Sequence, residues 1–280
     1  MEASERRACQ AVSQPRSTQR YQPWPRAEEV RLVKRMKQLS KKKPRYGYRR
    51  IGALLRTEGW KANRKRVHRL WRKEGLQVPA RQHKRRRRGN SEGGTQRRRA
   101  TRRNQVWSYD FVMDQTDDGR RLKFLPIVDE YTRECVDIRV ERSLRASEVV
   151  ASLREPMAAR GAPEHLRSDN GPEFIARAVR NWLAKAKIGT LYIEPGHPWE
   201  NAYSESFNSR FRDEFLNREV LTSLTEAKVL AQEYRREYNE RRPHSSLGYQ
   251  TPSVFAAACA AKKISSPLGG KKATTTTTTA

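Results

Sequence analysis

The sequence predicts an α/β protein, in which a mixed sheet carries helices on its faces and follows an all-helical, strongly basic domain. Charge divides the chain, because residues 1–105 carry 34 basic and 7 acidic residues, whereas residues 106–280 carry 26 and 24. The spacing of apolar residues changes at the same point, from a helical period to strand-like runs after residue 106. We therefore expect a polyanion-binding module joined to a near-neutral second domain.

The front part contains three predicted helices. The first covers about 27–40 and ends before Pro44, and the second ends at Gly59. The third begins at Asn63, a good N-cap residue, and ends at Gly75. The apolar stripes that predict these helices are Val30, Val33, Met36 and Leu39, then Tyr48, Ile51, Leu54 and Leu55, then Val67, Leu70 and Trp71, the last three expected to face inward.

Residues 26–78 thus form a predicted helix-turn-helix domain with a basic outer face on its last helix. Such a helix can enter a DNA major groove while its cations neutralise phosphates. A small helical bundle with a solvated basic face is the alternative. The residues expected to bind DNA are Arg64, Lys65, Arg66, Arg69, Arg72 and Lys73.

Three segments are expected to lie outside the folded domains. Residues 1–25 contain three of the prolines and are expected to be irregular. Residues 79–105 have almost no apolar side chains and form a predicted basic linker. Residues 259–280 include the low-complexity stretch "KKATTTTTTA" and are expected to be a disordered tail.

The region from 106 to 258 alternates strands and helices. Three apolar runs, at 106–113, 122–129 and 135–140, predict an antiparallel meander. The order of the predicted elements is βββαβαβα, which indicates a mixed sheet with helices packed on it. The later elements are a helix at about 146–159, a short segment into "HLRSDNG", a helix at about 173–186, a strand at 190–194 and a helix at 201–217.

Three carboxylates stand out in this region. Asp110 interrupts an apolar strand, where an unpaired charge near a core is costly, and Asp169 ends a strand before Asn170-Gly171. Glu205 follows Asp169 with 35 residues between them and lies on the helix 201–217. If the three converge at one sheet edge, they supply the oxygen ligands that hard divalent cations prefer. Two such ions can hold the attacking and leaving oxygens of a phosphodiester.

The helix 201–217 has two different faces. Its aromatic stripe is predicted to be core, whereas Glu205 points to the other side, together with Asn201, Asn208 and Arg212. The stripe consists of Tyr203, Phe207, Phe211 and Phe215.

Other candidate ligands give no comparable pattern. The three cysteines, Cys9, Cys135 and Cys259, are far apart, which excludes a disulfide framework and a Cys-rich zinc site. His197 and His244 have no metal-ligand partner at a suitable spacing, and we expect His244 to order a turn or to pack the C-terminal helix. No apolar run approaches the ~18 residues of a membrane span, so no membrane association is expected.

Several motifs together resemble one family, the DDE transposases encoded by the second open reading frame (OrfB) of the insertion-sequence-3 family. The resemblance runs almost end to end, and the core is also similar to retroviral integrases. The motifs that carry it are "YGYRRIGALLRTEGWKANRKRVHRLWRKEGL", "VWSYDFV", "RSDNGPEF", "PGHPWENAYSESFNSRFRDE" and "YNERRPHSSLGYQTP". The 35-residue spacing between Asp169 and Glu205, together with the last three motifs, is specific to the family.

The resemblance implies a fold and a site. The fold is an RNase H-like mixed five-stranded sheet with flanking helices over residues 106–258, preceded by the all-α helix-turn-helix domain. Asp110, Asp169 and Glu205 are implied as the catalytic triad that binds two Mg²⁺ or Mn²⁺ ions. Asp129 and Asp137, also on strands, are not placed in this triad. The resemblance further suggests supporting roles for Asn170 and Glu173 and DNA contacts for Asn201 and Arg212.

The implied function is DNA strand cleavage and strand transfer at the ends of an insertion sequence. The implied partners are DNA at the transposon ends and the target, at least one further copy of the chain, and an upstream OrfA-type protein or fusion. The implied location is the bacterial cytoplasm, at the nucleoid. Two alternatives are a repressor derived from a transposase and a plain RNase H-like nuclease. The intact acidic triad disfavours the first, and the helix-turn-helix and the "YNERRPH" motif disfavour the second.

Overall fold

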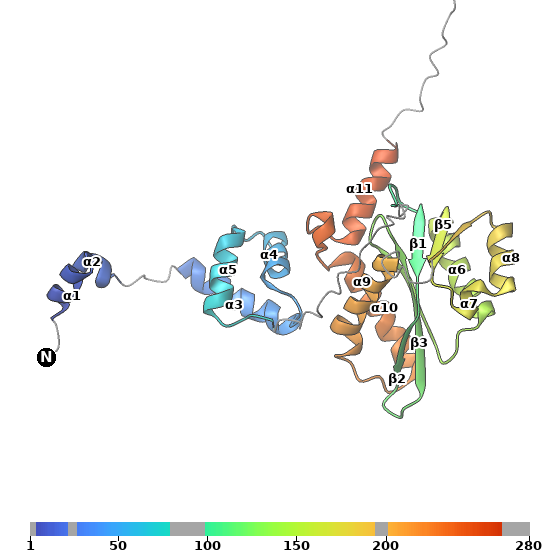
Figure 1. Cartoon of the computed structure of the whole chain (residues 1–280), viewed down its shortest axis with the longest axis horizontal. Helices are drawn as coiled ribbons and strands as arrows, with labels where there is room; N and C mark the ends of the chain where they lie inside the picture. The colour runs from blue at the N-terminus through green and yellow to red at the C-terminus, as the bar shows by residue number, and fades with distance from the viewer. Residues whose placement is uncertain (1–3, 22–26, 79–98, 194–200, 265–280) are drawn as a thin grey trace, which may run out of the picture. The chain divides into compact units, whose positions relative to one another are not determined.

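The computed structural model describes residues 4–21, 27–78, 99–193 and 201–264 (Figure 1). The chain forms two compact units, Met1–Arg81 and Gln82–Ala280. In the part described, no helix is long and apolar enough to cross a membrane.

The N-terminal segment differs from the irregular structure expected for residues 1–25. It contains two short helices, α1 (Glu5–Ala11) and α2 (Arg16–Gln19). Pro15 occupies the N-cap position of α2, where the missing amide hydrogen of proline does no harm. Arg20 links the two helices, since its guanidinium donates two hydrogen bonds of 2.8 Å to the carboxylate of Glu5. Pro15 therefore stands at the start of a helix.

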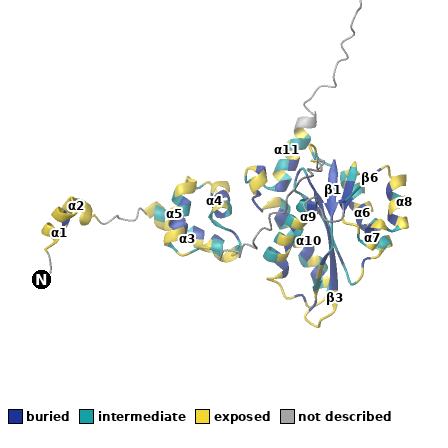
Figure 2. Cartoon of the chain, in the orientation of Figure 1, coloured by how far each residue is buried: buried dark blue, intermediate teal, exposed yellow. Residues whose placement is uncertain are grey.

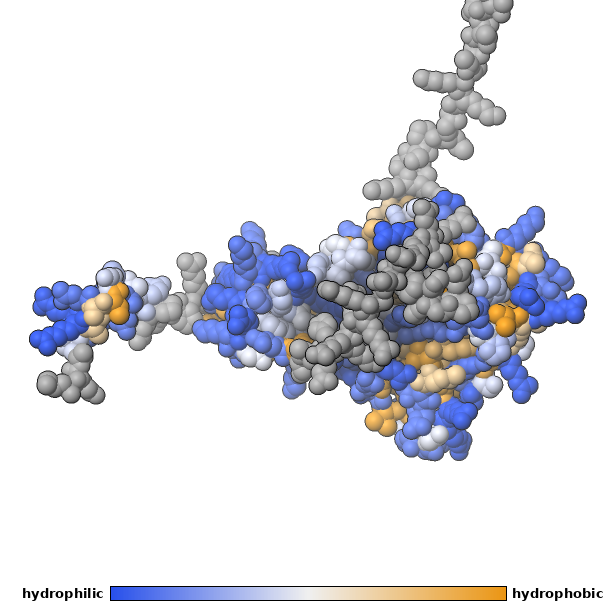
Figure 3. All heavy atoms as spheres, viewed as in Figure 1, coloured by the Kyte–Doolittle hydropathy of each residue, from blue (hydrophilic) through white to orange (hydrophobic). Residues whose placement is uncertain are grey.

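The helix-turn-helix region contains the three predicted helices, α3 (Ala27–Lys42), α4 (Tyr48–Thr57) and α5 (Arg64–Lys73). The Asn63 side chain caps α5 by accepting a 2.7 Å hydrogen bond from the amide of Arg66. The apolar stripe predicted for α3 is confirmed for Met36 and Leu39, which are buried, whereas Val30 is 56 % exposed and Leu32, outside the stripe, is fully buried. The residues that build this small core are Leu32, Met36, Leu39, Ile51, Leu55, Val67, Leu70 and Trp71. Much of the remaining surface is hydrophilic on the face seen in Figure 3.

The second unit contains one mixed sheet. Its strands lie in the order β4-β3-β1-β5-β6, and β2 extends along β3 beyond β1. β3 runs antiparallel to β1, β2 and β4, whereas β5 and β6 run parallel to β1. The predicted meander is confirmed. The strands are β1 (Val106–Tyr109), β2 (Val112–Gln115), β3 (Arg121–Asp129), β4 (Cys135–Glu141), β5 (His165–Ser168) and β6 (Gly189–Tyr192).

Within the described residues the sheet has six strands where five were predicted, because the run 106–113 is divided at Asp110-Phe111. β1 and β2 share one register along β3, from Tyr109 opposite Ile127 to Val112 opposite Phe124. The same register places Asp110 opposite Pro126, which has no amide hydrogen to donate to a ladder. The amide of Phe111 donates instead to the Asp110 carboxylate. The break therefore lies at the first of the three candidate carboxylates.

Helices cover both faces of the sheet, as the ribbon in Figure 1 shows. On one face α9 and α10 pack their aromatic residues, including Phe207, Phe211 and Tyr238, against Phe124 of β3. On the other face α6, α7 and α8 pack on Trp107, Leu125 and neighbouring residues. Figure 2 shows the buried residues concentrated along the sheet and the inner helix faces. The helices are α6 (Ala146–Arg160), α7 (Pro172–Ile175), α8 (Arg177–Lys185), α9 (Ala202–Phe211) and α10 (Leu224–Glu240).

Two predicted helices are interrupted. The helix expected at about 173–186 breaks at Ala176, whose ψ of 137° is extended, and so becomes α7 and α8. The helix expected at 201–217 continues past α9 as a single π-helical turn, Arg212–Leu216. At the C-terminus, α11 (Pro252–Ile264) runs past residue 258, so the disordered tail predicted from residue 259 is wrong as far as Ile264. Residues 265–280 lie outside the described part.

Candidate active site and DNA-binding helix

Asp110 lies between β1 and β2, half-buried and facing α9. Its Oδ2 accepts a 3.0 Å hydrogen bond from Nδ2 of Asn208, and its Oδ1 accepts one of 2.8 Å from the amide of Phe111. Burial, together with the negative charges of Asp169 and Glu205, raises the pKa of Asp110 to about 6, although the two hydrogen bonds act in the opposite direction. Asp110 is thus the carboxylate on which the charges of the other two predicted residues act.

Asp169 follows directly after β5 at the same sheet edge. β1 and β5 are parallel with Ser108 opposite Arg167, so Asp110 and Asp169 are each two residues beyond a paired position. The amide of Gly171 donates a 3.0 Å hydrogen bond to Oδ1 of Asp169. The predicted supporting residue Asn170 donates 2.8 Å from its Nδ2 to the carbonyl of Ile193, just past β6. These bonds fix a turn that presents Asp169 outward.

Glu205 is exposed in the first turn of α9. The aromatic stripe on the opposite face is core as predicted for Phe207, Phe211 and Phe215, which are all buried. Tyr203 is only half-buried, and the guanidinium carbon of Arg133 lies 3.9 Å from its ring centroid. The helix therefore anchors on the sheet through phenylalanines and leaves Glu205 exposed on the other side.

The two residues of α9 and its π turn that were expected to touch DNA differ in their environment. Asn201 is buried, 5 % exposed, with an Oδ1 atom that accepts no hydrogen bond from the described residues. Arg212 is partly exposed and donates 2.8 Å to the carbonyl of Met113, with its guanidinium 3.9 Å from Asp114. In this structure Arg212 therefore anchors α9 to β2, and its contact with DNA stays a prediction.

Three carboxylates could hold a metal ion: Asp110 at the strand break, Asp169 at a strand end and Glu205 on a helix. Among the described residues, no three His, Cys, Asp or Glu side chains are gathered closely enough to hold an ion. The donor set nevertheless suits a hard divalent cation, because it consists of carboxylate oxygens. Besides burial, the negative charges of Asp169 and Glu205 raise the pKa of Asp110, and a bound cation would offset these charges. Binding would require these carboxylates to draw closer together.

The six cations predicted to bind DNA on α5 fall into two groups. Arg66 lies 3.4 Å from Glu28 and 3.8 Å from Glu29, and Arg69 lies 3.0 Å from Glu29. Both guanidinium groups are therefore partly neutralised by the first turn of α3. The remaining four, which are exposed and form no ion pair with α3 in the described part of the chain, are Arg64, Lys65, Arg72 and Lys73.

Comparison with known proteins supports both units. Two models described as integrase core domains match residues 100–198 and 186–252, and a model described as an HTH-like domain matches residues 27–86. A 31.7 kDa protein of insertion element IS407 from Burkholderia multivorans is 43 % identical, with 91 % of each chain covered. A 39.2 kDa protein of insertion element IS476 from Xanthomonas euvesicatoria is 42 % identical, over 91 % of this chain and 72 % of that protein.

The chain belongs to the insertion-sequence-3 family of transposases. A more distant relative is the transposase InsD of insertion element IS2 from Escherichia coli, 28 % identical over 79 % of this chain and 77 % of that protein. The two integrase core models together cover residues 100–252, where the sequence predicts an integrase-like core and where the mixed sheet lies.

Solved structures similar to this transposase include two from retroviruses. One is in the structure of a simian T-cell lymphotropic virus intasome. The match spans 81 % of this chain and 74 % of the intasome chain, with 15 % identity and a TM-score of 0.49. The catalytic core of an HTLV-2 integrase covers 56 % of this chain, with 99 % of its own chain matched, 14 % identity and a TM-score of 0.47.

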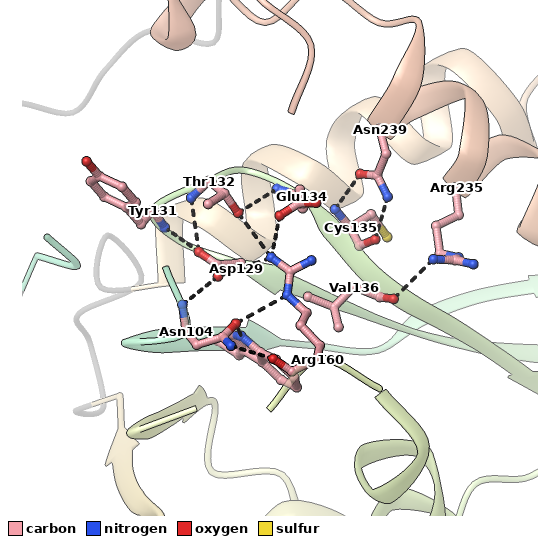
Figure 4. A network of polar contacts seen from close by, with 11 residues as sticks. Asn104, Asp129, Tyr131, Thr132, Glu134, Cys135, Val136, Arg160, Arg235 and Asn239 are labelled. Carbon is pink, nitrogen blue, oxygen red and sulfur yellow. Dashed lines mark hydrogen bonds and ion pairs between the residues drawn. The ribbon is translucent and has the colours of Figure 1, made fainter. Parts of the chain in front are cut away.

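Other acidic residues on the strands of the transposase have structural partners. Asp129 is fully buried and accepts hydrogen bonds from the amides of Asn104, Tyr131 and Thr132, with Arg160 at 3.5 Å (Figure 4). Asp137 accepts a 3.0 Å hydrogen bond from Gln232 of α10. Both side chains therefore bond within the scaffold, and their exclusion from the triad stays a prediction.

The histidines also match the sequence prediction where they are described. His244 orders a turn in the closing motif, because its Nδ1 lies 3.0 Å from Ser246 Oγ and its amide donates to the carbonyl of Gln250. His197 lies outside the described residues.

Sequence reasoning missed two ion pairs that support the site. Arg242, in the closing motif, donates hydrogen bonds of 2.7 and 2.6 Å to the two carboxylate oxygens of Glu214 in the π turn after α9. Lys123 of β3 pairs with Glu173 of α7, and this pair lowers the pKa of Glu173. All but Lys123 stand in motifs that carried the family resemblance, which was the available signal. The pairing itself joins residues far apart in sequence.

Proposed function

We propose that this transposase cleaves and joins DNA through Asp110, Asp169 and Glu205 as its metal-binding carboxylates. The carrying observation is that the charges of Asp169 and Glu205 act on half-buried Asp110 from a strand end and a helix. Like charges brought to one sheet edge are unfavourable by themselves and become favourable when a cation binds there. The family is a DDE-type polynucleotidyl transferase family, so the assignment also fits the reaction.

The proposed cofactor is two Mg²⁺ or Mn²⁺ ions. When bound, they would activate water or a 3′-hydroxyl and stabilise the leaving oxygen of the phosphodiester. The protein residues prepare that chemistry: Asn208 orients the carboxylate of Asp110, and the Gly171 amide orients that of Asp169. No covalent protein–DNA intermediate is needed, so the site requires no serine or tyrosine nucleophile.

The proposed DNA interface begins with α5. Its exposed cations Arg64, Lys65, Arg72 and Lys73 suit the phosphates of the element's ends, with Arg66 and Arg69 available if their pairs with α3 open. Asn201 and Arg212 would meet DNA near the catalytic helix. Asn170 and Glu173 would support the turn that carries Asp169.

The proposed assembly contains at least two copies of the chain on DNA, because two transposon ends must be joined. An upstream OrfA-type protein or fusion would complete end recognition. The place of action would be the bacterial nucleoid, where the element and its target reside.

The testing experiment compares wild type with Glu205→Gln on labelled DNA that carries the element's terminal repeats, in Mg²⁺. Glu219→Gln, at an exposed position past the π turn, serves as the matched control. We expect Glu205→Gln to abolish cleavage and joining while end binding persists, and the control to remain active. Equal activity of Glu205→Gln and wild type would refute the triad. If wild type and both variants bind the ends but none of them cleaves DNA, even with the OrfA-type partner added, the repressor alternative is favoured.

A further inference from the structure

Lys123 is a buried charge beside the proposed site. It lies on β3 with only 9 % of its surface exposed, in the row that continues with the core residues Leu125 and Ile127. This row faces α6, α7 and α8, whereas Phe124 faces α9. A buried ammonium group is costly unless it is paired, so its partners indicate what it is there to hold.

The partners of Lys123 come from the neighbours of two proposed catalytic carboxylates. Its Nζ lies 3.7 Å from the ring centroid of Phe111, which directly follows Asp110. The same Nζ forms an ion pair with Oε1 of Glu173, four residues after Asp169. A cation over an aromatic ring and a cation beside a carboxylate are both attractive, and both strengthen when water is excluded. One side chain thus connects the Asp110 strand to the helix after Asp169.

Aromatic packing makes a second connection between the same two elements. The ring of Phe174 in α7 stacks on Phe111 with centroids 4.5 Å apart, and meets the edge of Tyr109 at 4.6 Å. α7 is therefore held against the strand that leads to Asp110 by both a charge pair and a stack of rings. These contacts fix where the turn before α7 can lie.

The turn between β5 and α7 is compact, so a shift of Glu173 would reach Asp169. A Cβ atom added at Gly171 would lie 3.1 Å from Oδ1 of Asp169 and 3.7 Å from Oε2 of Glu173. The two carboxylates thus flank one glycine, whose amide donates to Asp169. Without a neutralising cation, Glu173 would place a further negative charge next to Asp169.

We propose that Lys123 is a positioning residue that sets the placement of Asp169 relative to Asp110. It holds Glu173 and Phe111 together, and it neutralises Glu173 so that this carboxylate neither repels Asp169 nor competes with it for a cation. The inference rests on the proposed function of Asp110 and Asp169. Lys123 itself touches neither carboxylate in any described contact and acts through its two neighbours.

The first test needs no metal and no activity. Hydrogen exchange is followed in the full-length, metal-free protein for Lys123→Met, Lys123→Arg and the control Lys228→Met, which removes a Lys–Glu pair between α10 and β4. We expect Lys123→Met to raise exchange at the amides of 171, 174 and 175 about tenfold, since these amides bond within the turn. Lys123→Arg and Lys228→Met should leave this exchange near wild type. Unchanged exchange in Lys123→Met would overturn the proposal.

The second test measures cleavage of terminal-repeat DNA in Mg²⁺. Lys123→Met should lower the cleavage rate about tenfold or more at unchanged end binding, because small displacements of reacting groups have large effects on rate. Lys123→Arg should recover most of that rate. Glu173→Gln should show the same loss, and the double variant should be no worse than either single one. Additive losses, or equal impairment of Lys123→Met and Lys123→Arg, would overturn the positioning role.

Two further variants keep the outcomes separable. If Lys123→Met does not fold, Glu173→Gln decides, because Glu173 is partly exposed and its loss breaks the same pair. Asp169→Asn tests the proposed function independently. Full activity of Asp169→Asn would refute the triad, whereas inactive Asp169→Asn with wild-type exchange and cleavage in Lys123→Met would refute only the role of Lys123.

Discussion

Nδ2 of Asn208 donates a 3.0 Å hydrogen bond to Oδ2 of Asp110, which joins α9 to the break between β1 and β2. Asn208 lies three residues after Glu205, so this bond also sets how far Glu205 stands from Asp110. The bond lowers the pKa of Asp110 against the upward effects of burial and two neighbouring carboxylates. The consequences for stability and metal binding can be measured.

Asp110→Asn should stabilise the metal-free protein at neutral pH. A carboxyl whose pKa is higher when folded, about 6 against an ordinary 3.8, adds stability at low pH that is lost as pH rises through about 6. The substituted amide has no charged form. Its oxygen can accept from the Phe111 amide, and its NH2 group can donate to Oδ1 of Asn208 once that side-chain amide turns over. We expect a gain of about 1–3 kcal/mol in the free energy of unfolding at pH 7.5, and a much smaller gain at pH 4. Urea unfolding in EDTA checks this, and an equal difference at both pH values would contradict it.

Mg²⁺ binding should weaken as pH falls through about 6. Below the pKa of Asp110 a proton occupies the carboxylate that an ion needs, so binding must release that proton. The Mg²⁺ concentration for half-maximal cleavage should rise about tenfold for each pH unit below 6 and level off above 7. Asn208→Ala, which removes a bond that lowers the pKa of Asp110, should move this dependence to higher pH. A flat Mg²⁺ requirement from pH 5 to pH 8 would argue against Asp110 as a ligand.

Gly171→Ala should slow cleavage without unfolding the protein. The φ of Gly171 is −56°, which alanine adopts easily, so the effect is steric. The new methyl group would lie 3.1 Å from Oδ1 of Asp169 and 3.3 Å from the Phe174 ring, which must move apart. We expect about a tenfold loss of cleavage rate. Gly47→Ala, where nothing lies within 4 Å, is the control and should cleave normally. Wild-type cleavage by Gly171→Ala would show that the turn tolerates displacement.

Arg242→Met should destabilise the catalytic unit strongly. Arg242 is 2 % exposed and forms two hydrogen bonds of 2.6 and 2.7 Å with Glu214. Removing the guanidinium leaves the Glu214 charge buried, which typically costs about 3–5 kcal/mol. Arg241→Met changes the exposed neighbour and should have little effect. Denaturant unfolding measures the difference, and Arg242→Met combined with Glu214→Gln should lose less than Arg242→Met alone. If the double variant loses as much unfolding free energy as Arg242→Met alone, the loss comes from packing and not from the buried charge of Glu214.

Glu29→Gln should strengthen DNA binding. The carboxylate of Glu29 lies near both Arg66 and Arg69, so its loss would release two cations of α5 toward phosphate. The slope of log Kd against log salt should steepen by about 1 for each new phosphate contact. Glu58→Gln, which frees Arg35 of α3, should leave the slope unchanged. Filter binding from low to high salt gives both slopes, and identical slopes for Glu29→Gln and wild type would mean that these arginines do not reach phosphate.

Sequence patterns alone determined the elements and the candidate carboxylates of this transposase. These are local properties, because backbone geometry repeats within a few residues. They include the period of apolar residues in α5, the Asn63 cap and the alternating elements of the core. The motifs around Asp110, Asp169 and Glu205 identified three acids, and in the folded protein the charges of Asp169 and Glu205 act on Asp110. Local patterns gave the wrong structure in several places. For example, the proline-containing N-terminal segment forms α1 and α2 instead of irregular structure, and the single predicted strand 106–113 is divided into β1 and β2.

Only the tertiary structure decided which side chains pair. Lys123 with Glu173 and Arg242 with Glu214 join residues 50 and 28 positions apart, and no periodicity records such pairings. The α5 face shows the same limit: six cations look equivalent in sequence, yet Arg66 and Arg69 meet glutamates of α3 when the helices pack. The strength of a charge depends on burial and on neighbours brought together by folding, so the raised pKa of Asp110 is a property of the folded protein.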